Sequence, residues 1–567
     1  MKNQLLKSIL CAGLFAYSGL SNVASAQAPD WAWAKSSGNT FAAQYVMNTV
    51  TDNDDNSYIT GWFTSSTLVL GGISLSNSGN DKKAYIAKYD PNGDVLWAKA
   101  AGGNSLNSES WAIAIDASNN VYISGIFSSA TITFDSATLN HTGNGSDLFL
   151  VKYDSNGNLI WAKDVDYSTS LWLLDMDVDL NGNIFLAGSF SYLPITFGST
   201  TLQSISNTHP FIAKFDTAGN VLWAKAPQNS TSYSNWGTAI ASDLLGNVFS
   251  SGNYLSADYD PFIIDGITLP NTNNNRNIYL VKYDASGNVI WIKTSVGTTS
   301  SSGGDYPYDL ASDTDGNVII IGAMRSSNLY FDAVTIMNSN SNNTPDIFLA
   351  KYDGNGNAVW AKNAGGSGYD EGHRVTTDSY NNVYATGYFE SKPASFGAIT
   401  ISKVDSYSPI FFVAQYDENG NETWVKHLEN TSGHSGNLPS NGVAVNSLGN
   451  IYVVGTAYSN AVFGTTTLSQ GGIFIAKMGS STTSIEEVES SYSEINIYPN
   501  PNNGQFVIEG RLSDFSIEVH NALGQLLLSQ RSLQQRIQID LQQQPSGIYH
   551  VSVRAEDEVS LFKVVKQ

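Results

Sequence analysis

A sequence motif of aromatic, apolar and turn-forming residues recurs along residues 31–478 and constrains the fold more than any other feature. One complete copy, YIAKYDPNGDVLWAK, occupies residues 85–99. Further copies, two of them halves, occupy residues 149–163, 211–225, 279–293, 348–362, 412–426, 31–35 and 473–477. The motif carries a tryptophan at Trp33, Trp97, Trp161, Trp223, Trp291, Trp360 and Trp424. Self-similarity at a nearly constant period indicates an array of equal supersecondary units.

A second motif lies between the copies and adds two strands to each unit. In one unit it comprises residues 112–116, a short turn, and residues 121–125. Each unit then holds four short runs of β-branched and aromatic residues that alternate with period two, bounded by Asn, Asp and Gly. We therefore predict four antiparallel strands per unit, here at 112–116, 121–125, 148–153 and 159–163. A glycine recurs in the second strand as Gly61, Gly125, Gly188, Gly252, Gly322, Gly387 and Gly455.

The short turns of each unit share the pattern Asp-x-x-Gly-Asn/Asp. Residues 90–94 are one example, and residues 116–120 are a near copy. An Asp that bonds the backbone ahead of it, followed by Gly or Asn in the left-handed region, is typical of a type I turn with a G1 bulge. The same carboxylates can alternatively be calcium ligands, but their spacing does not match an EF-hand loop. The pattern therefore favours structural turns.

The number of turns predicts how the ends of the repeats meet. Seven short turns join first and second strands, but only six join third and fourth strands. The missing turn would connect residue 477 to residue 31. We therefore expect residues 31–35 to complete the last unit, beside 442–446, 450–455 and 473–477. Such closure removes the exposed strand edges that an open stack leaves.

The units resemble the bacterial β-propeller repeats called SBBP and, more distantly, NHL repeats. The resemblance covers residues 31–478 and implies an all-β fold, a seven-bladed β-propeller over residues 27–478 closed by its N-terminal strand. The units depart from the family in longer segments between second and third strands, such as 127–145, which predict an added β-hairpin. The resemblance implies no single activity, because propellers host unrelated functions.

Residues 1–26 have the layout of a secretory signal peptide. Two lysines precede an apolar run over residues 9–16, and small residues end the segment at Ala26, before Gln27. A membrane anchor is the alternative, but the run is too short to cross about 30 Å of hydrocarbon. We therefore expect cleavage between Ala26 and Gln27. The single cysteine lies inside this segment, so the exported form can hold no disulfide, thiolate metal site or cysteine nucleophile.

Residues 495–567 differ in composition from the repeats and follow a polar, acidic linker over 479–494. Their strand-like runs predict a small antiparallel sandwich. Three short sequence motifs resemble those of the C-terminal sorting domain of the type IX secretion system. They are Ile497-Tyr-Pro-Asn-Pro501, Asn521-Ala-Leu-Gly-Gln525 and Pro545-Ser-Gly-Ile-Tyr549. The resemblance implies an Ig-like sandwich, contact with that machinery, and a secreted or outer-membrane-attached product of a Bacteroidetes-type bacterium. An appended adhesion sandwich is the alternative.

The charge balance argues against one class of partner. The chain has 28 Lys and Arg against 50 Asp and Glu, a formal net charge of −22. Nucleic acids and anionic membranes are bound through concentrated Lys and Arg, so we expect neither. After the signal segment no apolar run reaches the roughly 18 residues that a transmembrane helix needs, so we expect no transmembrane helix. We also expect the protein to be a monomer.

Strand polarity sorts the connections of such a ring onto two faces. The short turns share a regular face, and the longer connections, which differ between units, share the other. Variable loops on a rigid scaffold commonly carry recognition. The ligand-binding candidates near the channel mouth on that face are Tyr45, Trp111, Trp172, Trp236, Tyr306, Tyr308, Tyr369, Asp370, Glu371 and His373. Aromatic rings beside polar groups suit sugar binding, although the same rings can instead fill gaps between blades.

No catalytic residue is predicted, because the sequence lacks H-E-x-x-H, G-x-S-x-G and Gly-rich phosphate-loop motifs. Acid clusters at 52–55, 175–179 and 258–260 can bind calcium, which makes a calcium-dependent propeller hydrolase or lyase the alternative function. A surface-layer or matrix protein is a third possibility. We expect a non-catalytic binding or adhesion protein with a glycan or protein ligand, and neither a cofactor nor a metal site.

Overall fold

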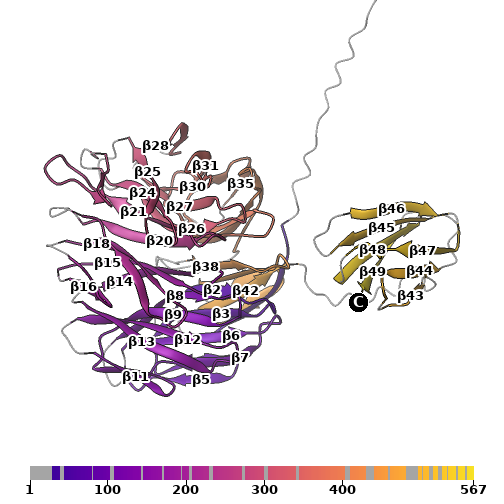
Figure 1. Ribbon diagram of the computed structural model, residues 1–567, viewed down its shortest axis with the longest axis horizontal. Coiled ribbons are helices and arrows are strands. Elements are labelled where there is room, and N and C mark those ends of the chain that lie inside the picture. The colour runs from indigo at the N-terminus through magenta and orange to yellow at the C-terminus, as the bar shows by residue number, and fades with distance from the viewer. Residues whose placement is uncertain are drawn as a thin grey trace, which may run out of the picture. The chain divides into compact units, whose positions relative to one another are not determined.

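The computed structural model describes residues 28–479 and 496–566, except residues 39–43, 80, 103–106, 142–144, 169–170, 193, 204–206, 229–233, 271, 273–274, 299–303, 340–343, 403–408, 429–439, 458–459, 501, 510–514, 522–525, 533, 545–546 and 556–557. The predicted signal peptide, its cleavage point and most of the predicted linker lie outside the described residues. The chain divides into two compact parts between Ser480 and Ser481. We call residues 28–479 the repeat region and residues 496–566 the C-terminal region (Figure 1).

Seven repeats build the repeat region, each with four antiparallel strands paired in the order first, second, third, fourth. The first strands are β2 (Gln44–Thr51), β8 (Ser108–Ile115), β14 (Leu171–Val178), β20 (Trp236–Ser242), β26 (Tyr306–Ser312), β32 (Asp370–Thr377) and β38 (Ser440–Val445). The second strands are β3 (Ser57–Phe63), β9 (Val121–Phe127), β15 (Ile184–Phe190), β21 (Val248–Tyr254), β27 (Val318–Met324), β33 (Val383–Phe389) and β39 (Ile451–Ala457). The third strands are β6 (Lys83–Tyr89), β12 (Ser146–Tyr153), β18 (His209–Phe215), β24 (Asn277–Tyr283), β30 (Asp346–Tyr352), β36 (Ile410–Tyr416) and β42 (Gly472–Met478). The fourth strands are β7 (Val95–Ala100), β13 (Leu159–Ser168), β19 (Val221–Lys225), β25 (Val289–Gly297), β31 (Ala358–Gly365), β37 (Glu422–His427) and β1 (Trp31–Ser36).

The strand β1 supplies the fourth strand of the last repeat. Trp33 lies opposite Lys477, and Lys35 lies opposite Ile475, in antiparallel register with β42. This is the pairing that the unequal numbers of turns predict. The edge of β42 is thereby covered by a strand that precedes the first repeat in the chain.

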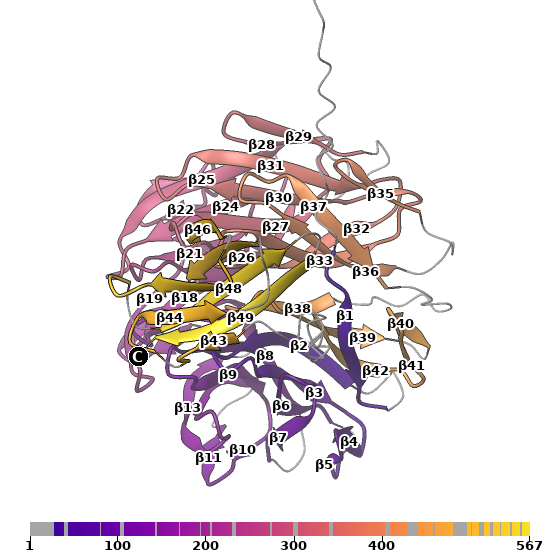
Figure 2. The same cartoon turned by 90° about the vertical axis from the view of Figure 1, so that its right-hand side faces the viewer.

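Every repeat adds a two-stranded hairpin between its second and third strands, as the long connections predict. The hairpins are β4 (Thr67–Leu70) with β5 (Ile73–Ser76), β10 (Thr131–Phe134) with β11 (Ala137–Asn140), β16 (Ile195–Phe197) with β17 (Thr200–Leu202), β22 (Ile263–Ile264) with β23 (Ile267–Thr268), β28 (Asn328–Phe331) with β29 (Val334–Met337), β34 (Ala394–Phe396) with β35 (Ile399–Ile401), and β40 (Ala461–Phe463) with β41 (Thr466–Leu468). In both views the hairpins β4–β5, β10–β11 and β28–β29 lie at the outside of the repeat region (Figures 1 and 2). The first strands lie inside. They contact one another in the order β2, β8, β14, β20, β26, β32 and β38, and β38 contacts β2.

Seven apolar cores lie between neighbouring sheets. One core joins Ile86 of repeat 1 to Ile123 of repeat 2, and similar cores join each later repeat to the next. The seventh core joins Ile475 of repeat 7 to Tyr85 of repeat 1. Each sheet therefore packs on both faces, and each fully buried apolar side chain contributes roughly 1.5–3 kcal/mol.

The short turns have the predicted geometry. Asp90 Oδ1 accepts hydrogen bonds from the backbone N–H groups of Asn92 (2.9 Å) and Asp94 (2.8 Å). Gly93 adopts a φ of 82°, and its N–H donates to the Asp90 carbonyl. The recurring aspartates are therefore bonded to the backbone of their own turns.

A buried ion pair adjoins the first turn of repeats 1 to 5. The turn aspartate lies near a lysine of the third strand in the pairs Asp52–Lys88, Asp116–Lys152, Asp179–Lys214, Asp243–Lys282 and Asp313–Lys351. Distances range from 2.8 Å in repeat 5 to 3.8 Å in repeat 3. Asp52 and Asp179, two acids of the candidate calcium clusters, thus face a cation of the protein itself.

The repeated tryptophan ties each fourth strand to the following repeat. Trp33 Nε1 donates to the Pro91 carbonyl at 2.9 Å, and Trp97 Nε1 donates to the Ser155 carbonyl at 3.2 Å. A Cβ on Gly93 would lie 2.9 Å from the Trp33 ring, so the turn packs directly on the indole. The tryptophan is therefore a packing residue that joins repeats.

The C-terminal region is a sandwich of two antiparallel sheets. One sheet has the order β43 (Asn496–Tyr498), β44 (Gln505–Glu509), β47 (Arg536–Asp540). The other has the order β46 (Leu526–Ser532), β45 (Phe515–Asn521), β48 (Gly547–Ala555), β49 (Glu558–Lys566). A shared core includes Phe506 and Ile539 from the first sheet and Val519 and Val551 from the second. Within the described residues of both regions, no helix is long and apolar enough to cross a membrane.

Candidate functional site

Every first strand carries a β-bulge at the same place. In repeat 2, Ser110 pairs with Gly125 and Ala112 pairs with Ser124, which leaves Trp111 as the extra residue. Bulges re-aim a side chain and are common next to functional sites. The bulge residues of repeats 1 to 7 are Met47, Trp111, Leu174, Thr238, Tyr308, His373 and Asn441. The backbone feature is repeated, whereas the side chain differs in every repeat.

The recurring glycine of the second strand makes room for this bulge. A Cβ on Gly125 would lie 1.9 Å from the Glu109 carbonyl oxygen, and one on Gly387 would lie 2.0 Å from the Glu371 carbonyl oxygen. Any side chain here would force the first two strands apart. A glycine that recurs inside a strand is the sequence signal for a bulge or a close backbone approach. The glycines are evident in the sequence, whereas the bulges were not predicted from it.

Replacing Gly125 with alanine is expected to lower the free energy of unfolding by about 1–3 kcal/mol, because the new methyl group overlaps a backbone oxygen. Denaturant unfolding of the exported chain would measure the change. Gly354→Ala is the matched control, because its nearest neighbour would lie at 3.3 Å. Equal effects of the two substitutions would contradict the role of the glycine in the bulge.

A group of polar and aromatic side chains gathers where β26 and β32 begin. Tyr308 Oη donates to Glu371 Oε2 at 3.3 Å, and His373 Nε2 lies 3.3 Å from the same oxygen. Arg325 Nη2 lies 3.8 Å from Glu371 Oε1, and its guanidinium lies 5.8 Å from the ring centroid of Tyr369. Tyr369 keeps 45% of its surface exposed. Four of the predicted site residues therefore meet in one group.

The electrostatics of this group keep Glu371 ionised. Burial alone would raise its pKa, but the hydrogen bond from His373 and the charge of Arg325 lower the pKa below its usual value. Burial and the Glu371 charge raise the pKa of Tyr308, so this phenol stays a neutral donor. Tyr388, which sequence reasoning missed, packs its ring 5.3 Å from the His373 ring. The group combines a fixed carboxylate, a guanidinium and an exposed ring.

A second group spans repeats 1 and 2. Tyr45 stacks on Trp62, with ring centroids 4.0 Å apart, and Lys82 Nζ lies 4.4 Å from the Trp62 centroid. Lys82 Nζ also lies 2.9 Å from Glu109 Oε1, and Trp111 Nε1 donates to Glu109 Oε2 at 3.1 Å. The predicted Tyr45 and Trp111 are thus linked by three residues that sequence reasoning missed.

A third, smaller group lies in repeat 4. The Arg276 guanidinium lies 4.5 Å from the Trp236 ring, a cation–π contact. Arg276 also donates to the Ser234 carbonyl at 2.6 Å and to Asn253 at 3.2 Å. Trp236 therefore packs against an arginine that directly precedes the third strand of the same repeat.

Three further predicted residues do not join these groups. Asp370 is fully buried, and its carboxylate accepts bonds from the N–H groups of Gly366 (2.9 Å) and Ser391 (3.1 Å), so it shapes a loop. Tyr306 pairs with Ala323 on the neighbouring strand. Trp172 lies on β14, and its side chain is outside the described part of the structure. Among the described residues, no group of three His, Cys, Asp or Glu suits a metal ion.

Comparison with protein families identifies the C-terminal region. Residues 496–567 match the family described as the secretion system C-terminal sorting domain. The match confirms the predicted type IX sorting domain. This domain marks proteins that the type IX system exports, so the protein is secreted or attached at the outer-membrane surface.

Two curated relatives match parts of the chain. An uncharacterised WD repeat-containing protein of Acanthamoeba polyphaga mimivirus is 24% identical over 507 residues, which cover 75% of this chain and 36% of the relative. The regulatory protein FlaEY of Caulobacter vibrioides is 30% identical over 162 residues, which cover 28% of this chain and 16% of FlaEY. The chain therefore spans well under two thirds of either relative.

Solved structures show weaker likenesses. A protein of unknown function from Dyadobacter fermentans has 13% identity and a TM-score of 0.36, over 65% of this chain and 93% of that protein. An ulvan lyase, a polysaccharide lyase, has 12% identity and a TM-score of 0.35, over 79% of this chain and 96% of the lyase. TM-scores at this level establish neither a shared fold nor a shared function.

Proposed function

We propose that the repeat region is a closed seven-bladed β-propeller of the SBBP type that acts outside the cell as a non-catalytic binding or adhesion module. Residues 1–26 are then its signal peptide, 27–478 the propeller, 479–494 the linker and 495–567 the sorting domain. Support for the closed ring comes from the seven cores, one of which joins the last repeat to the first. Support for a role outside the cell comes from the sorting domain.

The main support for a binding role is that the bulges share one backbone arrangement but carry different side chains. Seven repeats keep the same backbone, and the bulge side chains include an indole, a phenol and an imidazole at Trp111, Tyr308 and His373. A packing role alone would favour one residue type throughout, as it does for the repeated tryptophan. Variable side chains on a constant frame are typical of recognition surfaces.

A glycan is the ligand class that fits these groups best. The apolar face of a sugar ring can pack on an exposed ring such as Tyr369, while hydroxyl groups bond to Glu371 and Arg325 beside it. The stacked pair Tyr45 and Trp62, with Lys82, offers the same combination between repeats 1 and 2.

A glycan array probed with the exported chain tests this role. Tyr369→Ala combined with Trp111→Ala is expected to weaken binding at least tenfold and to leave the melting temperature nearly unchanged. Tyr330→Ala is the control, because Tyr330 lies on an outer hairpin and is 39% exposed, close to the 45% of Tyr369.

Two outcomes would contradict the proposal. One is that the unmodified chain binds no glycan or that the double variant binds as well as the control. The other is that the double variant unfolds, which would assign the rings to packing between repeats.

A further inference from the structure

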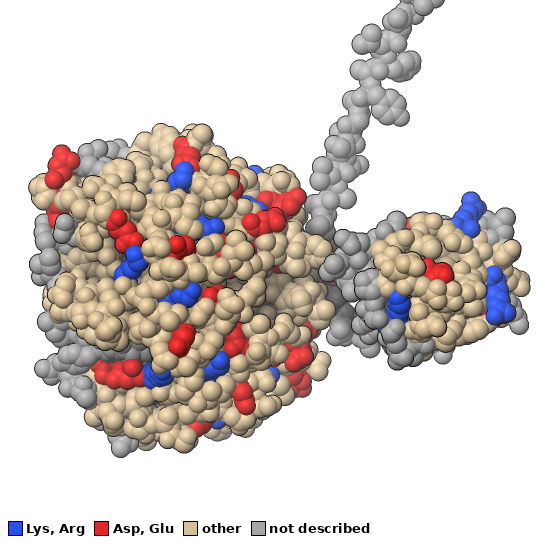
Figure 3. Space-filling view, viewed as in Figure 1, with Lys and Arg blue, Asp and Glu red and all other residues tan. Residues whose placement is uncertain are grey.

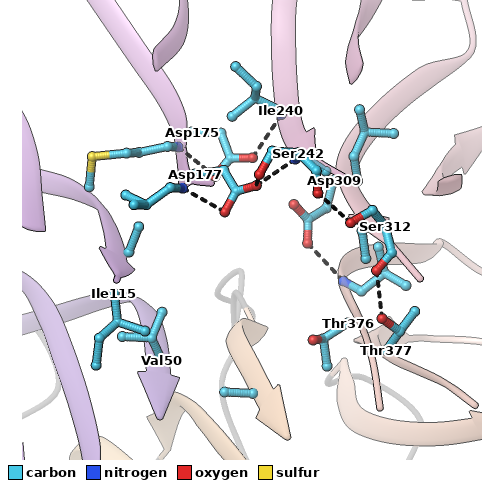
Figure 4. Close-up of a pocket in the computed structure, with 18 of the residues that line it drawn as sticks. Val50, Ile115, Asp175, Asp177, Ile240, Ser242, Asp309, Ser312, Thr376 and Thr377 are labelled. Carbon is cyan, nitrogen blue, oxygen red and sulfur yellow. Dashed lines mark hydrogen bonds between the residues drawn. The ribbon is translucent and has the colours of Figure 1, made fainter. Parts of the chain in front are cut away.

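The face formed by the short turns also carries an unassigned surface. A cavity of about 410 Å³ is lined by all seven first strands, from residues 48–51 of β2 round to residues 443–445 of β38. Its lining continues into the first turns of repeats 3 and 4, where it includes Leu180 and Leu244. Figure 4 shows Asp175 and Asp177 on β14 and Asp309 on β26, with Ser242 of β20 between them and Val50 and Ile115 across the cavity. The cavity therefore reaches the regular face that the short turns form.

Carboxyl groups outnumber cationic groups in this cavity. Asp175, Asp177 and Asp309 line it, and Arg374 is the only Lys or Arg among the described lining residues. Arg374 Nη1 lies 3.6 Å from Asp309 Oδ1. Asp177 Oδ2 accepts a hydrogen bond from Ser242 Oγ at 2.7 Å, a neutral donor. Asp179 and Asp243, which begin the first turns of repeats 3 and 4, also line the cavity. Unlike the other three aspartates, they face the lysines Lys214 and Lys282.

Burial disfavours the charged forms of these carboxyl groups. Burial and the Asp309 charge raise the pKa of Asp175 to about 8, and burial raises the pKa of Asp309 to about 6, against the opposing effect of Arg374. Burial likewise raises the pKa of Asp177. A cation in the cavity would stabilise the ionised forms of all three carboxylates.

Exposed leucines adjoin the cavity. Leu180 is 61% exposed and Leu244 is 53% exposed, and Leu245 and Leu448 on the same set of turns are also exposed. The turn does not require a leucine at the position after its aspartate, because Asn53 occupies that position in repeat 1. Large apolar side chains grouped on an exposed surface are typical of interaction sites.

We propose that this turn face docks a peptide segment of a partner protein that carries a Lys or Arg side chain between apolar residues. The apolar residues cover Leu180 and Leu244, and the cationic group enters the cavity towards Asp177. Asp177 lies two residues before the first turn, a depth of about 7 Å at the rise of a β-strand. The flexible stem of lysine or arginine spans such a distance and packs against apolar walls on the way. The acidity of the cavity makes an anionic lipid surface an unsuitable occupant.

Binding of a defined peptide to the full exported chain tests this site. The probe is a fluorescent, capped Leu-Arg-Leu peptide measured by fluorescence anisotropy, with Leu-Glu-Leu and Ala-Arg-Ala as matched peptides. Leu-Arg-Leu is expected to bind, and both matched peptides are expected to bind at least tenfold more weakly.

Two variants locate the site. Leu180→Asn with Leu244→Asn, and separately Asp177→Asn, are each expected to weaken Leu-Arg-Leu binding about tenfold. Leu222→Asn is the control, because Leu222 is 53% exposed, like Leu244, but lies on the outer strand β19. The leucine changes lie in exposed turns that accept asparagine, so they keep the test valid if Asp177→Asn fails to fold.

Three results would overturn the proposal: no saturable binding of Leu-Arg-Leu up to about 1 mM, equal binding of Leu-Glu-Leu, or equal loss in Leu222→Asn. Leucine-dependent binding to vesicles of anionic lipid, without peptide binding, would also overturn it. Peptide binding that survives Tyr369→Ala separates this site from the glycan-binding role proposed for the opposite face.

Discussion

Replacing Asp55 with alanine is expected to lower the free energy of unfolding of the repeat region by about 3–5 kcal/mol, because it leaves a buried lysine without its counter-charge. Asp55 Oδ2 lies 2.7 Å from Lys477 Nζ, and the two side chains are only 11% and 6% exposed. Tyr452 Oη also donates to Asp55 Oδ1 at 2.8 Å. Asp55 belongs to repeat 1, whereas Lys477 and Tyr452 belong to repeat 7. The substitution therefore acts where the last repeat meets the first.

The unusual role of Asp55 has a cause in repeat 7. The third-strand lysine of repeats 1 to 5 faces the aspartate of its own first turn, but in repeat 7 that turn begins with Asn446, which carries no charge. Asp55 reaches across from repeat 1 and supplies the carboxylate, and Asn450 Nδ2 donates to it at 3.0 Å. Asn446→Asp introduced into the Asp55→Ala protein would restore a local counter-charge for Lys477. We expect this second change to recover most of the lost stability.

Denaturant unfolding of the exported chain would measure both effects. Asp94→Ala is the control, because Asp94 is 76% exposed and lies 3.5 Å from Lys35 in a surface pair. Such pairs contribute about 0–1 kcal/mol. If Asp55→Ala costs no more than Asp94→Ala, or if Asn446→Asp rescues nothing, the pair does not hold the two repeats together.

Removing residues 496–567 is expected to reduce the protein found outside the cell to background levels, while the repeat region accumulates folded inside the cell envelope. The reason is that the sorting domain is the part that the type IX system recognises, whereas the repeat region has seven apolar cores of its own. Immunodetection in medium, surface and periplasmic fractions would measure the distribution. The effect is all-or-none rather than graded, because export needs the signal.

Two controls sharpen this result. Fusing residues 480–567 to a periplasmic reporter should carry the reporter outside, which shows that the domain is sufficient. Circular dichroism of the truncated protein should match that of the repeat region in the full chain, which excludes misfolding as the cause of retention. Normal amounts of the truncated protein in the medium would contradict the assignment of the export signal.

The repeated elements were predictable because their causes are local. Alternating side chains and Asp-x-x-Gly turns specify strands and hairpins within a few residues of one another. The turn around Asp90 has the geometry that its sequence indicates, and its carboxylate bonds its own backbone. The pairing of Trp33 with Lys477 followed from counting turns, since one strand had no partner in its own repeat.

The charge distribution was only partly predictable. On the face of the repeat region seen in Figure 3, acidic and basic side chains are interspersed rather than gathered into a large patch. The recurring turn aspartates account for part of the acidity. The partners of Lys88 and Lys282 did not follow from composition, because each lysine lies on a third strand and its aspartate lies in the first turn of the repeat.

The binding surfaces depended on contacts between distant segments. Tyr308 and Glu371 were both predicted as candidates. Arg325, which follows the second strand β27, and Tyr388, which lies on the second strand β33, join them from positions that the recurring motifs do not mark. Asp175 and Asp177 were recognised only as part of a sequence cluster, and Asp309 was not recognised. Their position opposite Arg374, with Leu180 at the cavity edge, follows from the placement of seven first strands around one space.

The sequence by itself determined the repeats, their strands and turns, the pairing of the first strand with the last repeat, and the sorting domain, because each rests on a local pattern or a short motif. Only the tertiary structure decided which side chains share a site and which charges compensate one another. Asp55 and Lys477 are 422 residues apart, and no local pattern pairs them. They meet because repeat 7 packs against repeat 1, and a buried charge is stable only beside a counter-charge that the fold brings to it.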